Sequence, residues 1–359
     1  MSDKNQRLIT LDAMRGIAAI LVVIFHLRNV GFSQAKSAYL AVDLFFLLSG
    51  FVIAKTYDPR LRAGLELWRF AILRYIRLYP LFAVGLFIAL AHRLWQISLG
   101  RPDAMTSTDV WLSLATEAFM LPSIPGMDLY MLNLPGWSLF FEIAVNLIYA
   151  AFLFKAPVKV LVAIAALTGT ALVWLTVSGD GINHGPRWEG LWFGFIRAGF
   201  AFTVGAILAR VHNSPPRESR IALIPMVVLI ALLCVPPKGY LFGAAYELTV
   251  VVILAPILVW VGATLNPPRS FFRASEAMGD LSYAIYVIHY PLIFICAWAA
   301  EEAGIDRIIW MPAFLVVALS LAWSLHRFFD VPIRIWLNDI VRRKYAHTKQ
   351  GQPTIVGTK

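Results

Sequence analysis

The stretch that decides the fold is LDAMRGIAAILVVIFH, which runs from Leu11 to His26. Its apolar residues suit a helix inside a lipid bilayer, yet it contains Asp12 and Arg15 near one end and His26 at the other. Arg15 and His26 are eleven residues apart, about three turns at ~3.6 residues per turn, so they share one face of the helix. An ionisable side chain is costly inside a membrane and marks a functional site. We therefore expect the rest of the chain to enclose this histidine and its partners.

The composition of the chain excludes a soluble protein. Of its 359 residues, 59% are hydrophobic and 14% are charged, and the mean hydropathy is +0.71. A soluble domain has about 25% charged residues. The net charge of +10 does not indicate nucleic-acid binding, because the basic residues lie in short loops between apolar segments. Both cysteines, Cys234 and Cys296, fall in apolar runs, so we expect neither a disulfide nor a metal site.

The apolar segments predict an all-α, polytopic membrane helix bundle with about ten transmembrane helices, since a span needs about 20 mostly apolar residues. The segment 108–121 is too short to span and is predicted to be an interfacial or re-entrant helix. Residues 1–335 form one transmembrane domain, and residues 336–359 are predicted to form a basic, partly disordered cytoplasmic tail. The predicted spans are 9–27, 38–57, 74–92, 134–154, 157–177, 190–209, 221–236, 241–263, 281–299 and 308–328.

Lysine and arginine are concentrated in alternate loops, which predicts that both termini are cytoplasmic. This orientation assigns a depth to each ionisable residue. It places one histidine and two carboxylates toward the outer leaflet, namely His26, Asp43 and Glu142. It places three arginines toward the cytoplasmic side, namely Arg15, Arg74 and Arg77.

Several predicted spans carry a polar stripe on one helical face. Such a stripe faces other helices or a water-filled cavity rather than lipid. In the second predicted span, the pair Ser49-Gly50 would allow another helix to approach closely. The residues expected to line the substrate site are Ser138 and Asn146, on the stripe that also holds Glu142, and Tyr286 and His289, on the stripe that begins at Ser282.

The ionisable residues have both catalytic and structural interpretations. A histidine held by a carboxylate can act as a general base toward a hydroxyl group, which suggests a His26–Glu142 pair. Alternatively, both side chains only hydrogen-bond between helices. Arg74 and Arg77 lie one turn apart, a spacing that suits a phosphate-bearing ligand. Alternatively, they anchor the protein to lipid headgroups.

Five motifs resemble those of the acyltransferase-3 family, integral membrane enzymes that O-acylate carbohydrates and related acceptors in the bacterial envelope. The first is LDAMRGIAAILVVIFH, which is similar to a family helix in which an arginine and a histidine are separated by ten residues. The others, in chain order, are VDLFFLLSGFVI with Asp43, RYIRLYPLF with Arg74 and Arg77, PGWSLFFE with Glu142, and LSYAIYVIHYPL with His289.

This resemblance implies a donor, a site and a location. The donor is an acyl-CoA, usually acetyl-CoA, supplied from the cytoplasm, and the acceptor is a carbohydrate or glycolipid. It implies that His26 is catalytic and that Arg74 and Arg77 help to hold the donor. It also implies the bacterial cytoplasmic (inner) membrane, with separate envelope glycan-assembly proteins as candidate partners. The acceptor stays open among lipopolysaccharide, exopolysaccharide, periplasmic glucan, peptidoglycan and a glycosylated metabolite.

We therefore expect a membrane O-acyltransferase in which Arg15, Arg74 and Arg77 bind the CoA phosphates, and His26, Glu142 and Asp43 carry the chemistry. His26 either deprotonates the acceptor hydroxyl or is itself acylated first. The alternative is a proton-coupled transporter that uses the same histidine and carboxylates, with His289, as a proton relay. Paired repeats with broken helices are typical of many transporters, and the chain has no such halves.

Overall fold

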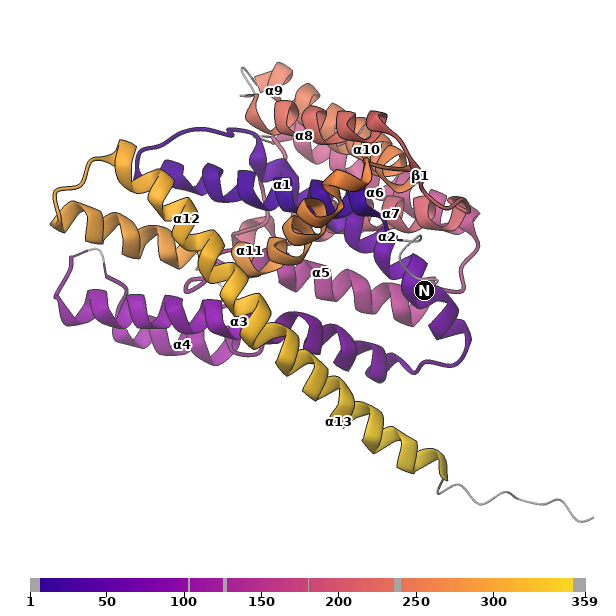
Figure 1. The fold of residues 1–359 in the computed structure, drawn as a ribbon, viewed down its shortest axis with the longest axis horizontal. Helices are drawn as coiled ribbons and strands as arrows, with labels where there is room; N and C mark the ends of the chain where they lie inside the picture. Colours follow the sequence, from indigo (N-terminus) through magenta and orange to yellow (C-terminus); the bar gives the residue numbers. More distant parts are fainter. Residues whose placement is uncertain (1–6, 103, 125–127, 180, 236–239, 351–359) are drawn as a thin grey trace, which may run out of the picture.

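The computed structural model describes residues 7–102, 104–124, 128–179, 181–235 and 240–350. It is a bundle of helices that lie roughly alongside one another, as Figure 1 shows. Helices dominate because a backbone in a bilayer must satisfy its hydrogen bonds within its own segment. The helices are α1 (Ile9–His26), α2 (Ala41–Arg62), α3 (Leu67–Ser98), α4 (Ser107–Glu117), α5 (Gly136–Ile148), α6 (Val158–Ser178), α7 (Leu191–Val211), α8 (Ile224–Cys234), α9 (Tyr240–Leu248), α10 (Ala255–Thr264), α11 (Phe272–Glu302), α12 (Arg307–Leu325) and α13 (Val331–Gln350).

Three π-helical segments connect or extend these helices. They extend α5 at Tyr149–Leu153, join α9 to α10 at Thr249–Leu254, and join α12 to α13 at His326–Asp330. The two short strands β1 (Arg217–Glu218) and β2 (Leu265–Asn266) pair in parallel, with Arg217 opposite Leu265. The predicted all-α membrane bundle is thus confirmed.

Within the described residues, nine helical segments are long and apolar enough to cross a membrane. The remaining predicted span, 221–236, corresponds to Arg220–Cys234, which is shorter. Its contacts show that it nevertheless covers the same depth as α1. Near its start, Ser219 N donates to Asn266 O, and the side chain of Asn266 accepts from Ile9 N at the start of α1. Near its end, Leu233 O accepts from Ser37 N, which follows α1.

Two helix pairs form the centre of the bundle: α1 packs on α11, and α2 packs on α7. In the second pair, Gly50 and Gly205 let the two backbones touch. A Cβ added at Gly50 would lie 2.0 Å from Phe202 O, and one added at Gly205 would lie 2.0 Å from Leu47 O. The close approach expected at Ser49-Gly50 is therefore present.

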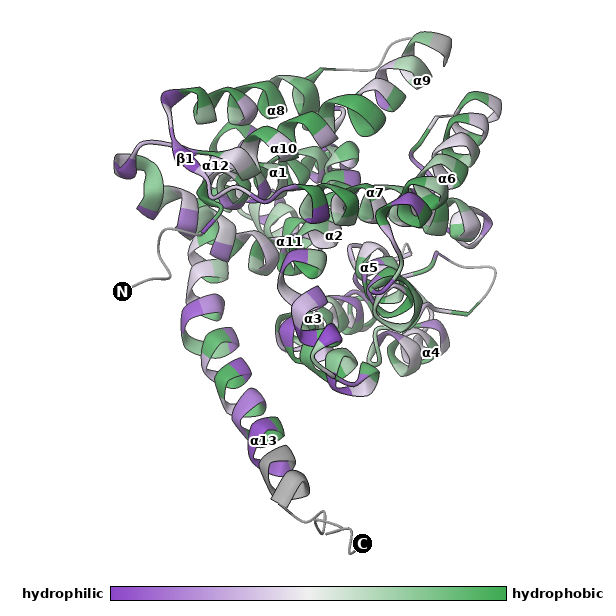
Figure 2. Ribbon diagram, turned by 90° about the vertical axis from the view of Figure 1, so that its right-hand side faces the viewer, coloured by the Kyte–Doolittle hydropathy of each residue, from purple (hydrophilic) through white to green (hydrophobic). Residues whose placement is uncertain are grey.

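The segment after residue 335 continues as a helix rather than leaving the fold at once. Figure 1 shows α12 running on into α13, which extends beyond the other helices. Figure 2 shows that hydrophilic residues are frequent on α13, whereas the bundle helices are mostly hydrophobic. Within the tail predicted at 336–359, residues 336–350 are helical, and residues 351–359 lie outside the described residues.

Candidate active site

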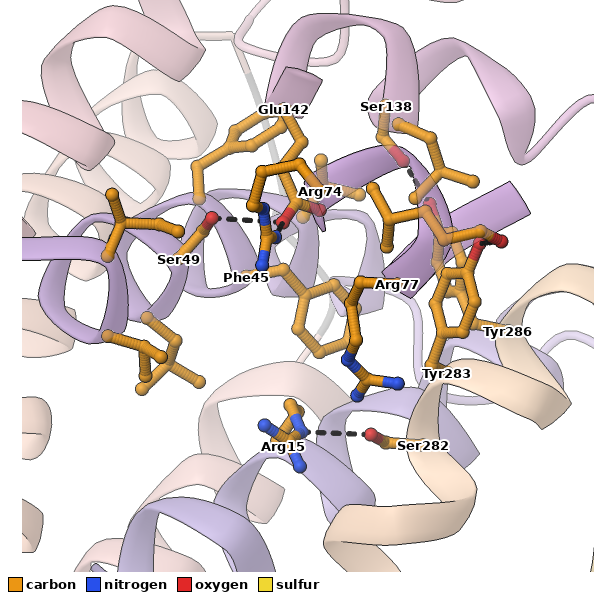
Figure 3. Close-up of a pocket in the computed structure, with 17 residues that line it drawn as sticks. Arg15, Phe45, Ser49, Arg74, Arg77, Ser138, Glu142, Ser282, Tyr283 and Tyr286 are labelled. Atoms are coloured by element: carbon orange, nitrogen blue, oxygen red, sulfur yellow. Dashed lines mark hydrogen bonds and ion pairs between the residues drawn. The ribbon is translucent and has the colours of Figure 1, made fainter. Parts of the chain in front are cut away.

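Five helices surround a cavity of about 160 Å³. Arg15 comes from α1, Ser49 from α2, Arg74 and Arg77 from α3, and Glu142 from α5. The fifth helix, α11, contributes Ser282, Tyr283 and Tyr286. Figure 3 shows these side chains converging from separate helices. The three arginines expected to bind the donor thus line one cavity, together with the predicted substrate-site residues Ser138 and Tyr286.

Arg15 is held at one end of the cavity by α11. Its Nε donates to Ser282 Oγ at 3.0 Å and its Nη2 donates to Gly279 O at 2.8 Å. Asp12, three residues earlier on α1, accepts a further hydrogen bond from Nη2 at 3.2 Å. These contacts fix the guanidinium between α1 and α11 at the edge of the cavity.

Arg74 and Arg77 differ in how well their charges are compensated. Arg74 Nη2 lies 3.1 Å from Glu142 Oε1, while its buried Nε has no hydrogen-bond partner among the described residues. Arg77 lies over the ring of Tyr283 at 5.9 Å from the ring centroid. Among the described residues, no carboxylate pairs with Arg77. Figure 3 shows the Arg77 guanidinium directed toward the Arg15 side of the cavity, away from Glu142.

Glu142 is the counter-ion of Arg74 rather than the partner of His26. It also accepts a hydrogen bond from Ser49 Oγ at 2.9 Å, and Ser49 reaches Asn146 Oδ1 at 3.4 Å. The predicted His26–Glu142 pair is therefore wrong. The predicted span began at residue 74, whereas α3 begins at Leu67, so Arg74 lies two turns into the helix, where it meets Glu142 of α5.

The hydrogen-bond partner of His26 is His289 on α11. The two rings join through His289 Nε2 and His26 Nδ1, which are 3.0 Å apart. Val22 O also lies 3.0 Å from His26 Nδ1. His289 is fully buried, and its Nδ1 contacts the backbone carbonyls of Ile285 at 3.1 Å and Tyr286 at 2.8 Å. The same Tyr286 lines the cavity, where its hydroxyl lies 2.6 Å from Ser138 Oγ.

Asp43 does not line the cavity. It forms a buried two-point ion pair with Arg197 of α7, with Nε–Oδ1 at 3.1 Å and Nη2–Oδ2 at 2.6 Å. Arg197 Nη1 donates to His184 O. The expected grouping of Asp43 with His26 and Glu142 is therefore corrected, because a buried carboxylate requires an opposite charge and Arg197 provides it.

Several residues of the site were not predicted. Ser49 and Tyr283 line the cavity, and both lie inside motifs whose charged members attracted attention first. Asp330, fully buried between α12 and α13, pairs with Arg334 at 2.7 Å and with His326 at 3.3 Å. An acidic residue followed by arginine four positions later on one helix was the available signal for this pair.

The segment that leads into α5 is held by a carboxylate outside the spans. Glu117, at the end of α4, is fully buried and accepts backbone hydrogen bonds from Met131, Leu132 and Asn133 at 2.7–3.2 Å. Burial raises the pKa of Glu117 to about 7, against the effect of these hydrogen bonds, which lower it. The short helix predicted at 108–121 is present as α4, and its terminal carboxylate positions the start of the cavity wall.

The chain is similar in sequence to several known proteins. The chain is 34% identical to protein 2 in the picA locus of Rhizobium radiobacter over 179 residues, 47% of this chain and 94% of that protein. It is 28% identical to the peptidoglycan O-acetyltransferase OatA of Listeria monocytogenes over 90% of this chain, and it spans 55% of that protein's length. It is 25% identical to the acyltransferase MdmB of Streptomyces mycarofaciens, with 92% of this chain and 93% of that protein covered.

No solved structure is significantly similar to this chain. A sequence model of the family described as an acyltransferase domain matches residues 8–327, which include the cavity and the histidine pair. Because this match covers most of a chain with many membrane-spanning helices, the protein belongs to the acyltransferase-3 family of multi-pass membrane acyltransferases.

Proposed function

We propose that the protein is an O-acyltransferase of the bacterial cytoplasmic membrane. It moves an acyl group, in the first instance acetyl, from acyl-CoA on the cytoplasmic side to a hydroxyl of an envelope or exported carbohydrate or glycolipid. The relatives named as a peptidoglycan O-acetyltransferase and an acyltransferase support the reaction class. Family membership favours this reaction over the proton-coupled transporter.

The observation that carries the donor assignment is the excess of positive charge in the cavity. Arg15, Arg74 and Arg77 line it, whereas Glu142 is its only carboxylate among the described lining residues. Charges held away from water need compensation, and among the described residues no carboxylate is in direct contact with Arg77, which only the more distant Asp330 attracts. Guanidinium groups bind phosphate through paired, charge-assisted hydrogen bonds, and CoA carries several phosphates. The cavity therefore suits the phosphate-bearing end of the donor.

The positions of Arg15 and His26 on α1 suit a donor that lies along this helix. Their separation of eleven residues corresponds to a rise of about 16 Å. An extended pantetheine arm covers a distance of this order, so a donor whose phosphates contact the arginines would present its thioester near His26. Tyr286 connects the cavity with the histidine pair, because it lines the cavity while its backbone carbonyl contacts Nδ1 of His289.

His26 would then carry the transfer in one of two ways. As a base, its imidazole takes the proton of the acceptor hydroxyl, and the oxygen attacks the thioester carbonyl. The carbon–sulfur bond breaks and the CoA thiolate takes a proton, which leaves an ester and free CoA. As a nucleophile, the imidazole of His26 attacks the thioester carbonyl, the carbon–sulfur bond breaks and CoA leaves as the thiolate. The acceptor hydroxyl then attacks the acyl-imidazolium, its proton passes to the CoA thiolate, and the carbon–nitrogen bond breaks to release neutral His26 and the ester. Labelled donor supplied without acceptor would label the protein only in the second case.

The test uses the full chain in nanodiscs and whole cells. CoA affinity is measured by calorimetry for wild type, Arg77→Gln and the matched control Arg273→Gln, which removes an exposed arginine of α11 that does not line the cavity. Arg77→Gln should weaken CoA binding about tenfold or more, and the control should not. An unchanged affinity of Arg77→Gln would refute the donor site.

The acceptor class is tested separately by mass spectrometry of envelope glycans from cells that lack the gene. Wild type should add an acyl mass increment, and His26→Ala at equal membrane abundance should not. An increment produced equally by His26→Ala would refute the role of this histidine. No increment with folded wild type would refute a glycan acceptor.

A further inference from the structure

The contacts of His289 determine which of its nitrogens carries hydrogen. Its Nδ1 faces the carbonyls of Ile285 and Tyr286, and a carbonyl can only accept. In the neutral ring, Nδ1 therefore carries the hydrogen and Nε2 carries the lone pair. Because Nε2 of His289 lies 3.0 Å from Nδ1 of His26, the hydrogen between the rings belongs to His26.

The same reasoning fixes the state of His26. Its Nδ1–H is shared between His289 Nε2 and the carbonyl of Val22, both of which accept. The lone pair of neutral His26 is therefore on Nε2. This is the arrangement of the histidine in a Ser-His-Asp triad, in which the orienting group accepts from Nδ1–H and leaves Nε2 as the base.

The two carboxylates that were expected to share the chemistry with His26 have other partners. Glu142 pairs with Arg74, and Asp43 pairs with Arg197. In the part of the chain that the structure describes, no carboxylate forms a hydrogen bond or ion pair with either imidazole of the His26–His289 pair. The orienting group of His26 is thus a second, neutral imidazole, itself held by two backbone carbonyls of α11.

We propose that His289 is the positioning residue of His26: it fixes the tautomer in which His26 Nε2 is the reactive nitrogen. When Nε2 takes a proton or an acyl group, the positive ring keeps two acceptors at Nδ1, His289 Nε2 and Val22 O. The protein thereby stabilises this charge with dipoles alone, in a region where a buried carboxylate would need its own compensation. This inference rests on the proposed function, because it concerns the same transfer.

The test exploits the different chemistry of glutamine and leucine at position 289. Glutamine places an amide oxygen about where His289 Nε2 lies, so it can accept from His26 Nδ1–H, whereas leucine cannot. His289→Leu should lower kcat by about 100-fold or more with KM for acetyl-CoA within about threefold of wild type. His289→Gln should recover kcat to within about tenfold of wild type.

A matched control separates positioning from packing. Ile293→Ala truncates another fully buried side chain of α11, one turn beyond His289, and this side chain makes no hydrogen bond. It should lower thermal stability without changing kcat per folded molecule. Rates are compared only for monodisperse protein. If His289→Leu does not fold, His289→Gln is compared with His289→Asn instead. The side chain of asparagine is too short to reach His26, so His289→Asn should be slow.

Two results would overturn the inference: an unchanged kcat in His289→Leu, or a folded His289→Gln no faster than the variants that cannot accept from His26. These results are distinct from failure of the proposed function. If His26→Ala retains transfer, the assigned reactive residue is wrong. If His26→Ala is inactive while His289→Leu is fully active, only the positioning role is wrong.

Discussion

Arg74 and Glu142 are partners: Nη2 of the arginine lies 3.1 Å from Oε1 of the carboxylate, on a wall of the cavity. A residue expected to bind the donor is thus joined to one expected to act on the acceptor. Glu142 is also the single carboxylate among the described residues that line the cavity, so it opposes the binding of an anion there while it holds Arg74 in place.

This pairing predicts that Glu142→Gln binds CoA several-fold more tightly than wild type. The amide still accepts from Arg74 and Ser49, but the negative charge that repels phosphate is removed. Calorimetric titration of purified protein with CoA measures the effect. Arg74→Gln, which removes a positive charge from the cavity, should bind CoA more weakly than wild type. Weaker CoA binding by folded Glu142→Gln would show that its charge is needed for the geometry of Arg74.

The buried Asp43–Arg197 pair predicts a loss of stability rather than of chemistry. Arg197 and Asp43 are 0% and 1% exposed, so Asp43→Ala leaves an uncompensated guanidinium in the bundle, at a cost of about 3–5 kcal/mol. Size-exclusion profiles and melting temperatures in detergent measure this cost. The double variant Asp43→Leu/Arg197→Met should recover much of it. An Asp43→Ala protein as stable as wild type but inactive would restore the catalytic assignment.

The contact of α2 with α7 predicts that Gly50→Ala is poorly tolerated. Its Cβ would lie 2.0 Å from the carbonyl oxygen of Phe202, which is backbone and cannot turn aside, so the helices must separate at a cost of about 1–3 kcal/mol. Gly199→Ala is the matched control on α7, where the nearest atom is a methyl group of Thr168 at 3.9 Å. Equal yields of folded protein from both variants would contradict this packing.

Glu117 predicts a pH-dependent stability. Its pKa is about 7 in the fold and 4.5 as a reference for the unfolded chain, so the folded state binds the proton more tightly. Stability should therefore be greatest below about pH 4.5, fall as the pH rises to 7, and level off above, by about 3 kcal/mol at most. Unfolding of wild type and Glu117→Gln between pH 4.5 and 8 isolates this contribution. If the stability of wild type relative to Glu117→Gln rises with pH instead, this prediction is wrong.

The bundle was predictable because hydropathy reports span positions directly, and the predicted spans correspond to helices of the structure. The grouping of Arg15, Arg74 and Arg77 was also predictable from their common depth. The start of α3 was less predictable: the charged Arg69 interrupts the apolar residues there, so the predicted span began at residue 74, seven residues after the helix starts at Leu67.

The partners of the ionisable residues were not predictable, because depth gives no information on the direction around a helix axis. His26 and Glu142 were placed at similar depths, yet they belong to different hydrogen-bond groups. Arg197 was visible as a charge within a span, but nothing local connects it to Asp43, 154 residues earlier. His289 shares a helical face with Ser282 and Tyr286, as expected, and only the packing of α11 on α1 brings it to His26.

The pairing of α1 with α11 has a consequence for how the protein is made. Arg15 meets Ser282 and His26 meets His289, so two contacts more than 260 residues apart in sequence complete the site. During synthesis α1 emerges first, and its arginine and histidine must wait for these partners until α11 follows. In the described part of the chain, six helical segments long enough to span a membrane and the shorter Arg220–Cys234 lie between the two helices. A chain that stops before α11 therefore lacks half of the contacts that complete the site, and it leaves Arg15 and His26 in the membrane without their partners on α11, which is costly.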